Sequence, residues 1–233
     1  MRKVHLYMFF LCIAGALLNV AIPRVTHGFL FFGVLFLDTI VTVSFTLLFG
    51  PVWGAITGAL SNIISHTIES WGWEIYLFTL CNIATALITY LFMRLFPREL
   101  SLPHQQETRV NFRILQKSQR LAFVIERVVV LILLSFALCI AMSILGGLIA
   151  AFIQTINPSR IGASRLSPND IYAMFPQGFS LILGEILVRI PINIVDRLIS
   201  AFSGYGIALA LSVFICRMKA KRSNLSKEPR TAA

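Results

Sequence analysis

Charged and amide side chains interrupt the apolar runs of this 233-residue chain at spacings that place them on shared helix faces. Glu185 and Arg189 are four residues apart, and Asn193 and Asp196 are three apart, so each pair shares one face of a helix. The amide of Asn193 can both donate and accept hydrogen bonds, and Asp196 offers a carboxylate. Such groups suit the binding of a polar small molecule in an otherwise apolar pocket.

Five further polar or aromatic residues are candidates for the same kind of site. They are Asp38, Asn62, His66, Trp71 and Asn82. His66 and Glu69 lie three residues apart and could offer two metal ligands from one helix face, but no second motif completes a metal site. We therefore expect substrate-binding residues and no bound metal.

Sequence signatures of nucleotide hydrolysis and of common hydrolases do not occur in the chain. There is no GxxxxGK[ST], no HExxH and no GxSxG. Lysine is missing from Val4 to Gln116 and again from Ser118 to Met218, which excludes a P-loop in those stretches. We expect a protein that is not an enzyme and that needs no cofactor.

The composition places the chain in lipid. Hydrophobic residues make up 57% of it and charged residues 13%, whereas a soluble domain carries about 25% charged residues. The net charge of +10 comes mainly from Lys and Arg in the flanks and loops between apolar runs, as membrane topology predicts. The long interior stretches lack aromatic residues interleaved with basic ones, so nucleic-acid binding is not expected.

The apolar runs predict an all-α membrane domain over residues 1–216, because a helix needs about 20 apolar residues to cross a bilayer. The six predicted spans are at about 6–23, 29–49, 52–68, 75–95, 122–153 and 192–215. Basic clusters before the first span, between the fourth and fifth, and after the last place both termini in the cytoplasm, including a basic tail at 217–233. A seventh span at 179–190 would export that tail, so six spans are preferred.

With this orientation the candidate binding residues lie at one level, the outer half of the membrane. Ionisable groups there cost about 2.5–3.5 kcal/mol each, so they usually face a cavity or a partner. A ligand cavity and a set of ion pairs that merely holds the bundle together both remain open. At the inner end of the third span, Gly54-x-x-x-Gly58 permits close contact with a neighbouring helix.

Two stretches resemble the substrate-binding S components of energy-coupling factor (ECF) vitamin transporters. LDTIVTVSFTLLFGPVWGAITGALSNII, Leu37 to Ile64, is similar to the second and third helices of that family. There an acidic residue precedes an apolar helix, a Phe-Gly-Pro turn and a helix of small residues ending in Asn or Asp. PINIVDRLI, Pro191 to Ile199, resembles the start of the sixth helix, where riboflavin-type members carry Pro-x-Asn-x-x-Lys.

The resemblance implies a vitamin-binding subunit in the cell membrane of a prokaryote. Its partners would be a transmembrane coupling subunit and two ATPase subunits. Cys12 and Ala16 are the nearest equivalent of the small residues that dock the coupling subunit in that family. Loops at 23–28, 69–74 and 157–178 would close over the ligand. Asp196 stands where riboflavin-type members have Lys, which suits a cationic or donor-rich ligand.

Two other classes remain open at the level of sequence. A multi-spanning sensor module with a small ligand pocket would show similar spans and similar outer polar residues. A structural membrane scaffold would show them too, but would bind no ligand saturably. Co-purification with a coupling subunit and ATPases would separate an importer subunit from a sensor.

Overall fold

All regular secondary structure in the described part of the chain is helical. The computed structural model describes residues 2–29, 36–69, 72–105, 117–156 and 181–225. The helices are α1 (Arg2–Phe29), α2 (Ile40–Phe49), α3 (Pro51–Glu69), α4 (Thr79–Leu95), α5 (Lys117–Ile156) and α7 (Leu181–Leu225), with short 3-10 helices η1 (Trp73–Phe78) and η2 (Pro103–Gln105). The predicted all-α class is confirmed for these residues.

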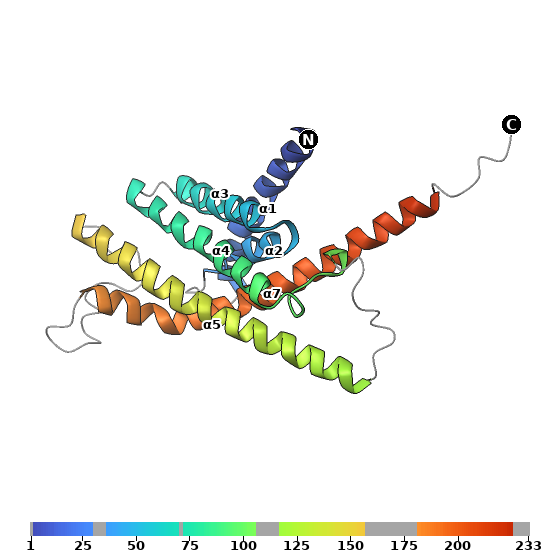
Figure 1. Cartoon of the computed structure of the whole chain (residues 1–233). Helices are drawn as coiled ribbons and strands as arrows, with labels where there is room; N and C mark the ends of the chain where they lie inside the picture. Colours follow the sequence, from blue (N-terminus) through green and yellow to red (C-terminus); the bar gives the residue numbers. More distant parts are fainter. Residues whose placement is uncertain (1, 30–35, 70–71, 106–116, 157–180, 226–233) are drawn as a thin grey trace.

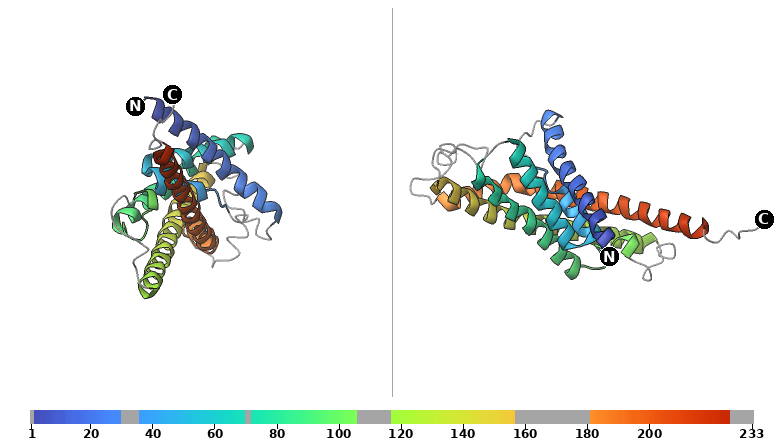
Figure 2. Two further views of the ribbon diagram at one scale, coloured as in Figure 1. Left: turned by 90° about the vertical axis from the view of Figure 1, so that its right-hand side faces the viewer. Right: turned by 90° about the horizontal axis from the view of Figure 1, so that it is seen from above.

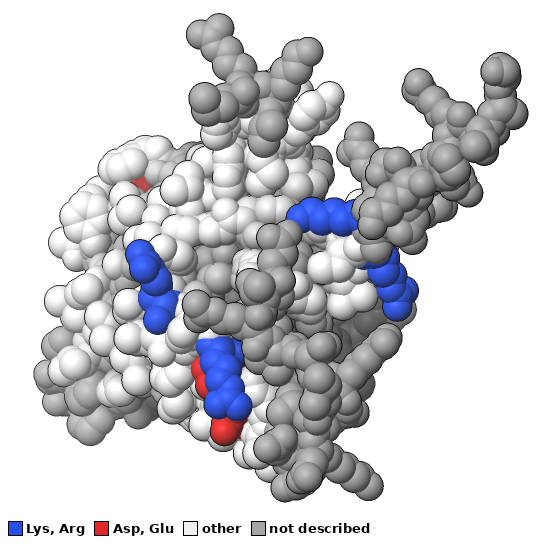
Figure 3. Space-filling model, turned by 45° about the vertical axis from the view of Figure 1, so that its right-hand side comes forward, with Lys and Arg blue, Asp and Glu red and all other residues white. Residues whose placement is uncertain are grey.

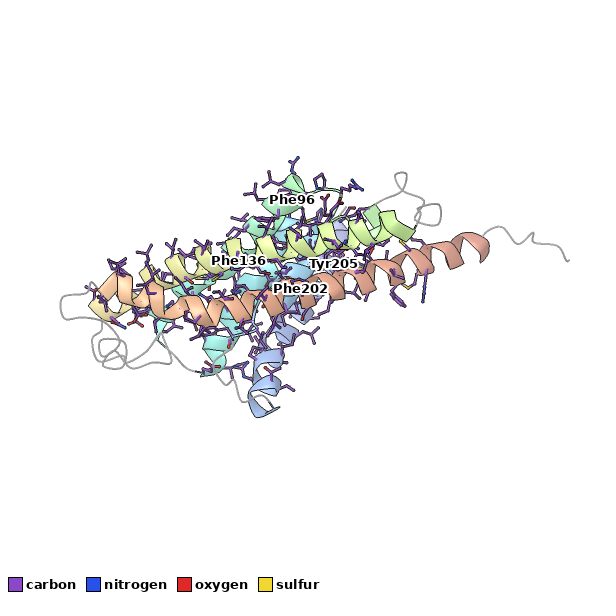
Figure 4. All side chains as sticks on the ribbon, turned by 90° about the horizontal axis from the view of Figure 1, so that it is seen from below. Phe96, Phe136, Phe202 and Tyr205 are labelled. Atoms are coloured by element: carbon purple, nitrogen blue, oxygen red, sulfur yellow. The ribbon has the colours of Figure 1, made fainter. Side chains whose placement is uncertain are left out.

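In the described part of the chain, four helical segments are long and apolar enough to cross a membrane. They cover His5–Thr26, Trp73–Leu95, Leu121–Ile156 and Leu181–Lys219. Many of their apolar side chains point outward: Phe136 on α5 and Phe202 on α7, both labelled in Figure 4, are 48% and 37% exposed. The described part of the face in Figure 3 carries only scattered charges. These features are those of an integral membrane protein.

Helix α2 is the centre of the bundle. Its nine residues from Ile40 to Leu48 are all buried, and α1, α3, α4 and α7 all pack against it. Figure 1 shows α2 enclosed by its neighbours, and Figure 2 shows α5 and α7 running side by side while α1 crosses the bundle steeply. A helix of 10 residues is too short to cross a bilayer by itself.

The first two predicted spans differ from the structure. Helix α1 continues to Phe29, so the loop expected at 23–28 is helical. Arg24 Nη1 donates to the Val20 carbonyl at 2.9 Å, and Thr26 Oγ1 donates to the Ile22 carbonyl at 2.9 Å. These bonds support the helix on both sides of Pro23, whose ring removes one backbone donor. The second helix begins only at Ile40, so the prediction of a helix throughout 29–49 is wrong for residues 36–39.

The last predicted span also begins earlier than expected. Helix α7 runs through Pro191 from Leu181, so residues 181–190 join the helix that was predicted to begin at 192. Packing explains this, because a Cβ on Gly147 of α5 would lie 2.9 Å from the backbone of Ile186. That close approach fixes the turns of α7 ahead of Pro191. The basic tail predicted from 217 is helical as far as Leu225.

The third, fourth and fifth predicted spans agree with α3, α4 and α5 within a few residues, except that Trp73–Phe78 forms a 3-10 helix. The prediction that small residues bring α3 close to a neighbour is confirmed. A Cβ on Gly54 would collide with the side chain of Thr46 and lie 3.0 Å from its Cα, and a Cβ on Gly58 would lie 3.0 Å from Thr42. The neighbour is α2.

Gly58→Leu is therefore expected to lower the free energy of unfolding by about 1–3 kcal/mol, the usual cost of overpacking. The added side chain has to displace Thr42 and Asn82, both of which are buried. Gly206→Leu is the matched control, because Gly206 also lies in a helix and a Cβ there meets nothing within 4 Å. Thermal melting in detergent measures the difference. Equal melting of the two variants would contradict the packing.

Candidate functional site

Six of the nine predicted binding residues line one cavity. The cavity has a volume of about 280 Å³, close to the lower end of the range for small-molecule sites, about 300–1,000 Å³. The six residues are Asp38, Asn62, His66, Asn82, Arg189 and Asn193. They come from the turn before α2, from α3 and α4, and from α7, where Arg189 lies more than 100 residues after Asn82 along the chain. The structure thus brings these six side chains together around one space.

The cavity lies at one end of the bundle. Its lining residues belong to the C-terminal halves of α1, α3 and α5, to η1 and the beginning of α4, to the N-terminal half of α7 and to the turn before α2. Since α1 and α3 run toward this end while α4 and α7 run away from it, the lining residues share one level. Which side of a membrane this level faces stays a prediction.

Glu185 and Asp196 do not line the cavity but lie behind its wall. Both are 0% exposed. Glu185 accepts hydrogen bonds from Gln154 Nε2 at 2.6 Å and from Arg189 Nη2 at 3.3 Å. Asp196 accepts one from the Leu37 amide at 2.8 Å and pairs with Arg197 at 2.9 Å. Glu185 therefore positions Arg189, and Asp196 positions Arg197 and the backbone turn at Leu37. Trp71, the ninth predicted residue, lies outside the described residues.

The turn at residues 36–39 brings Asp38 to the cavity. Leu37 has a positive φ of 45°, which is unfavourable for a bulky side chain. Two contacts from α7 hold the turn in place: the Leu37 amide donates to Asp196, and Thr39 Oγ1 accepts from Arg197 Nη1 at 2.6 Å. Asp38, which falls inside the predicted second span at 29–49, therefore lies in a non-helical turn.

Amide groups connect the cavity wall to its neighbours. Asn82 Nδ2 donates to the Gly58 carbonyl at 3.1 Å and to Asp38 Oδ2 at 3.3 Å. Asn193 Nδ2 donates to Ser143 Oγ at 2.9 Å. His66 packs edge-on against the ring of Tyr76, with 6.1 Å between the ring centroids. These bonds fix the orientation of the Asn82 and Asn193 side chains. The side-chain carbonyl oxygen of each residue is a potential acceptor for a ligand.

Sequence reasoning missed Asn19, although a lone amide in an apolar span is itself a signal of function or packing. Asn19 is fully buried; it donates to Thr42 Oγ1 at 3.0 Å and accepts from the Val41 amide at 2.8 Å. Thr39, the N-cap of α2, makes no side-chain capping bond. Asn19 on α1 thus satisfies a donor of the first turn of α2 that a cap residue normally satisfies.

Arginines at the cavity were also left out of the predicted set. Arg24 and Arg197 both line it. Arg24 pairs with Glu69 at 3.0 Å, with 39% of each side chain exposed. Each of the three arginines that line the cavity therefore has a carboxylate partner: Glu69 for Arg24, Glu185 for Arg189 and Asp196 for Arg197.

The predicted docking pair, Cys12 and Ala16, is not accessible to another subunit. Both residues are 0% exposed, and the Cys12 thiol donates to the Trp53 carbonyl on α3 at 3.6 Å. The small residues of α1 are used within the bundle instead, since a Cβ on the adjacent Gly15 would lie 2.8 Å from the Phe45 ring. This part of the sequence-based interpretation is wrong.

Within the described ranges no group of three or more His, Cys, Asp and Glu side chains could hold a metal ion. The cavity instead offers amides, the carboxylates of Asp38 and Glu69, and guanidinium groups, with Phe78 and Ile75 as apolar lining. That mixture suits a small organic molecule that combines an apolar body with polar groups. Comparison of the chain with protein-family models, with curated proteins and with solved structures found no match.

Proposed function

We propose that this chain is the substrate-binding subunit of an ECF-type importer and that it binds a small, vitamin-like molecule in the cavity. One observation carries the proposal: residues chosen from sequence as ligand-binding groups line one cavity of about 280 Å³ at one end of an apolar helical bundle. Buried ionisable residues of membrane helices usually face a cavity or a partner. Here Asp38 and three arginines line the same cavity.

The transport context comes from the sequence resemblance to S components. In that context a transmembrane coupling subunit and two ATPases supply the energy, in the cell membrane of a prokaryote. The six-span topology with both termini in the cytoplasm belongs to this proposal, as does the placement of the cavity toward the outside. The docking surface for the coupling subunit has to lie somewhere other than Cys12 and Ala16, because both are buried.

Filling the cavity tests the proposal. Gly146 of α5 lines it, and a Cβ there would lie 3.8 Å from Arg189 and 3.9 Å from Phe78, which is ordinary contact. A phenylalanine at this position places a ring in the space that a ligand needs. We expect the wild-type protein, purified in mild detergent, to carry a bound small molecule detectable by mass spectrometry. The Gly146→Phe variant should lose it while still folding.

Gly206→Phe is the matched control, because a Cβ there meets nothing within 4 Å, and it should keep the bound molecule. A wild-type protein that binds no small molecule saturably, or a Gly146→Phe variant that keeps it, would contradict ligand binding in the cavity. Co-purification with a coupling subunit and ATPases tests the transport part. ATP-driven uptake by the chain alone in liposomes would refute the assignment as an S component.

A further inference from the structure

The charges around the cavity are not balanced. Three arginines line it, and each has a carboxylate partner within 3.3 Å. Asp38 is a fourth carboxylate at the wall, and within the described residues it has no ion pair; its one hydrogen bond there comes from the Asn82 amide at 3.3 Å. Counted over the described residues alone, the cavity wall and its direct ion partners therefore carry one more negative charge than positive charges.

Asp38 is held where it is by contacts that do not involve its own side chain. The adjacent Leu37 adopts a positive φ of 45°, and α7 holds the turn through the bonds from the Leu37 amide to Asp196 and from Arg197 to Thr39. Unfavourable backbone conformations of this kind persist only where the surrounding structure imposes them, and they gather at functional sites. The unusual conformation of Leu37 places the Asp38 carboxylate at the cavity wall.

A ligand group that matches Asp38 has to supply positive charge. A protonated nitrogen forms both a charge-assisted hydrogen bond and an ion pair with a carboxylate, and a partly buried carboxylate is costly without a partner. Asn82 supplies one long hydrogen bond at 3.3 Å from an uncharged donor, and its other N–H bonds to the Gly58 carbonyl at 3.1 Å. One protonated nitrogen next to Asp38 would complete the pairing around the cavity.

An anionic ligand fits the same surroundings less well. Arg189 and Arg197 line the cavity, but Glu185 and Asp196 neutralise them from behind at 3.3 Å and 2.9 Å. Both carboxylates are fully buried and pair with these arginines in the structure as it stands. A ligand carboxylate or phosphate would have to compete with them and would also be repelled by Asp38.

We propose that the cavity selects a small molecule with a protonated nitrogen, and that this nitrogen donates to Asp38. This inference rests on the proposed ligand-binding function and names the class of its ligand, an organic amine or other nitrogen cation. The cavity volume of about 280 Å³ lies near the lower end of the range for small-molecule sites, about 300–1,000 Å³, so the ligand is small. An apolar body of that size would lie against Phe78.

Three probes of nearly equal size test the charge preference. Phenethylamine is cationic at neutral pH, 2-phenylethanol is neutral and phenylacetate is anionic, and each combines one phenyl ring with one polar group. The melting temperature of the full-length protein in lipid nanodiscs is measured at increasing concentrations of each probe. We expect phenethylamine to reach half-maximal stabilisation at a concentration at least tenfold lower than either of the other two.

Variants assign the preference to Asp38. Asp38→Asn keeps an acceptor for Asn82 and leaves the bonds of Leu37 and Thr39 unchanged, so it should fold, and its tenfold preference should disappear. Glu126→Gln is the matched control, because Glu126 is exposed and pairs only loosely with Arg98, at 3.9 Å; it should keep the preference. Gly146→Phe, in which the new side chain fills the cavity, should show no saturable stabilisation by any probe. Any change in its melting temperature therefore measures the effect of probe that dissolves in the lipid.

Two kinds of failure are distinguishable. If the probes bind saturably but the neutral or the anionic one binds as well as the amine, or if Asp38→Asn keeps the preference, the inference about the ligand class is overturned while ligand binding stands. If none of the three probes stabilises the wild-type protein saturably, the inference is overturned as well. If, in addition, no bound molecule is found in the purified protein, the proposed function fails with it.

Discussion

Asp196→Ala is expected to lower the free energy of unfolding by about 3–5 kcal/mol, the range for removing one partner of a buried ion pair. Asp196 is 0% exposed and Arg197 is 6% exposed, so the guanidinium would lose its partner at 2.9 Å without access to bulk solvent. The Leu37 amide would also lose its acceptor at 2.8 Å. Reversible unfolding in detergent, or a thermal melt of the purified protein, measures the loss.

The double variant Asp196→Leu with Arg197→Met separates the two contributions. Replacing a whole buried ion pair by apolar side chains of similar size is often close to neutral, so most of the loss should be recovered. An unsatisfied Leu37 amide still costs about 1–3 kcal/mol, and the bond from Arg197 to Thr39 is absent too. Recovery should therefore be partial. A single variant that melts like the wild type would mean that the pair does not hold the turn.

This expectation replaces the role that sequence alone suggested for Asp196. Asn193 and Asp196 are one turn apart on α7, and both were assigned to a ligand. In the structure Asn193 lines the cavity, whereas Asp196 points to the turn before α2. Spacing along a helix predicts a shared face but not which residue of that face reaches the cavity. That depends on where the segment 36–39 packs.

The helical class and the bounds of α3 could be predicted because the signals are local. Gly50 and Pro51 separate two apolar runs, and α3 begins at Pro51, where proline is well tolerated. The beginning of α2 is marked only by Asp38 and Thr39, residue types that favour helix starts, within a run at 29–49 that is otherwise long and largely apolar. It is determined by Asn19, which bonds to the Val41 amide from 22 residues away in sequence.

The sequence predicted which residues belong to the candidate site better than it predicted what each of them does there. Charges and amides are rare in apolar spans and costly there, so Asp38, Asn82 and Arg189 were recognisable from sequence. Which arginine pairs with which carboxylate follows from tertiary packing. The pairing of Arg24 on α1 with Glu69 at the end of α3 could not be read from a sequence that suggested a loop at 23–28.

Glu185→Gln is expected to lower the free energy of unfolding by about 3 kcal/mol, because it removes the charge of one partner of a buried ion pair. Arg189 is 8% exposed, and its pairing with Glu185 spans 3.3 Å. The glutamine still offers an oxygen to Gln154, which donates to Glu185 at 2.6 Å. The substitution therefore removes a charge and little else, and thermal melting of the purified variant measures the effect of that charge.

Glu69→Gln provides the comparison, because it makes the same change in an exposed ion pair. Arg24 and Glu69 lie closer together, at 3.0 Å, but 39% of each side chain is exposed, and exposed pairs contribute at most about 1 kcal/mol. We expect the shorter ion pair to matter less than the longer one, because solvent access outweighs a few tenths of an ångström. Equal losses for the two variants would show that Glu185 and Arg189 are reached by solvent through the cavity, and that their pairing does little to hold α7.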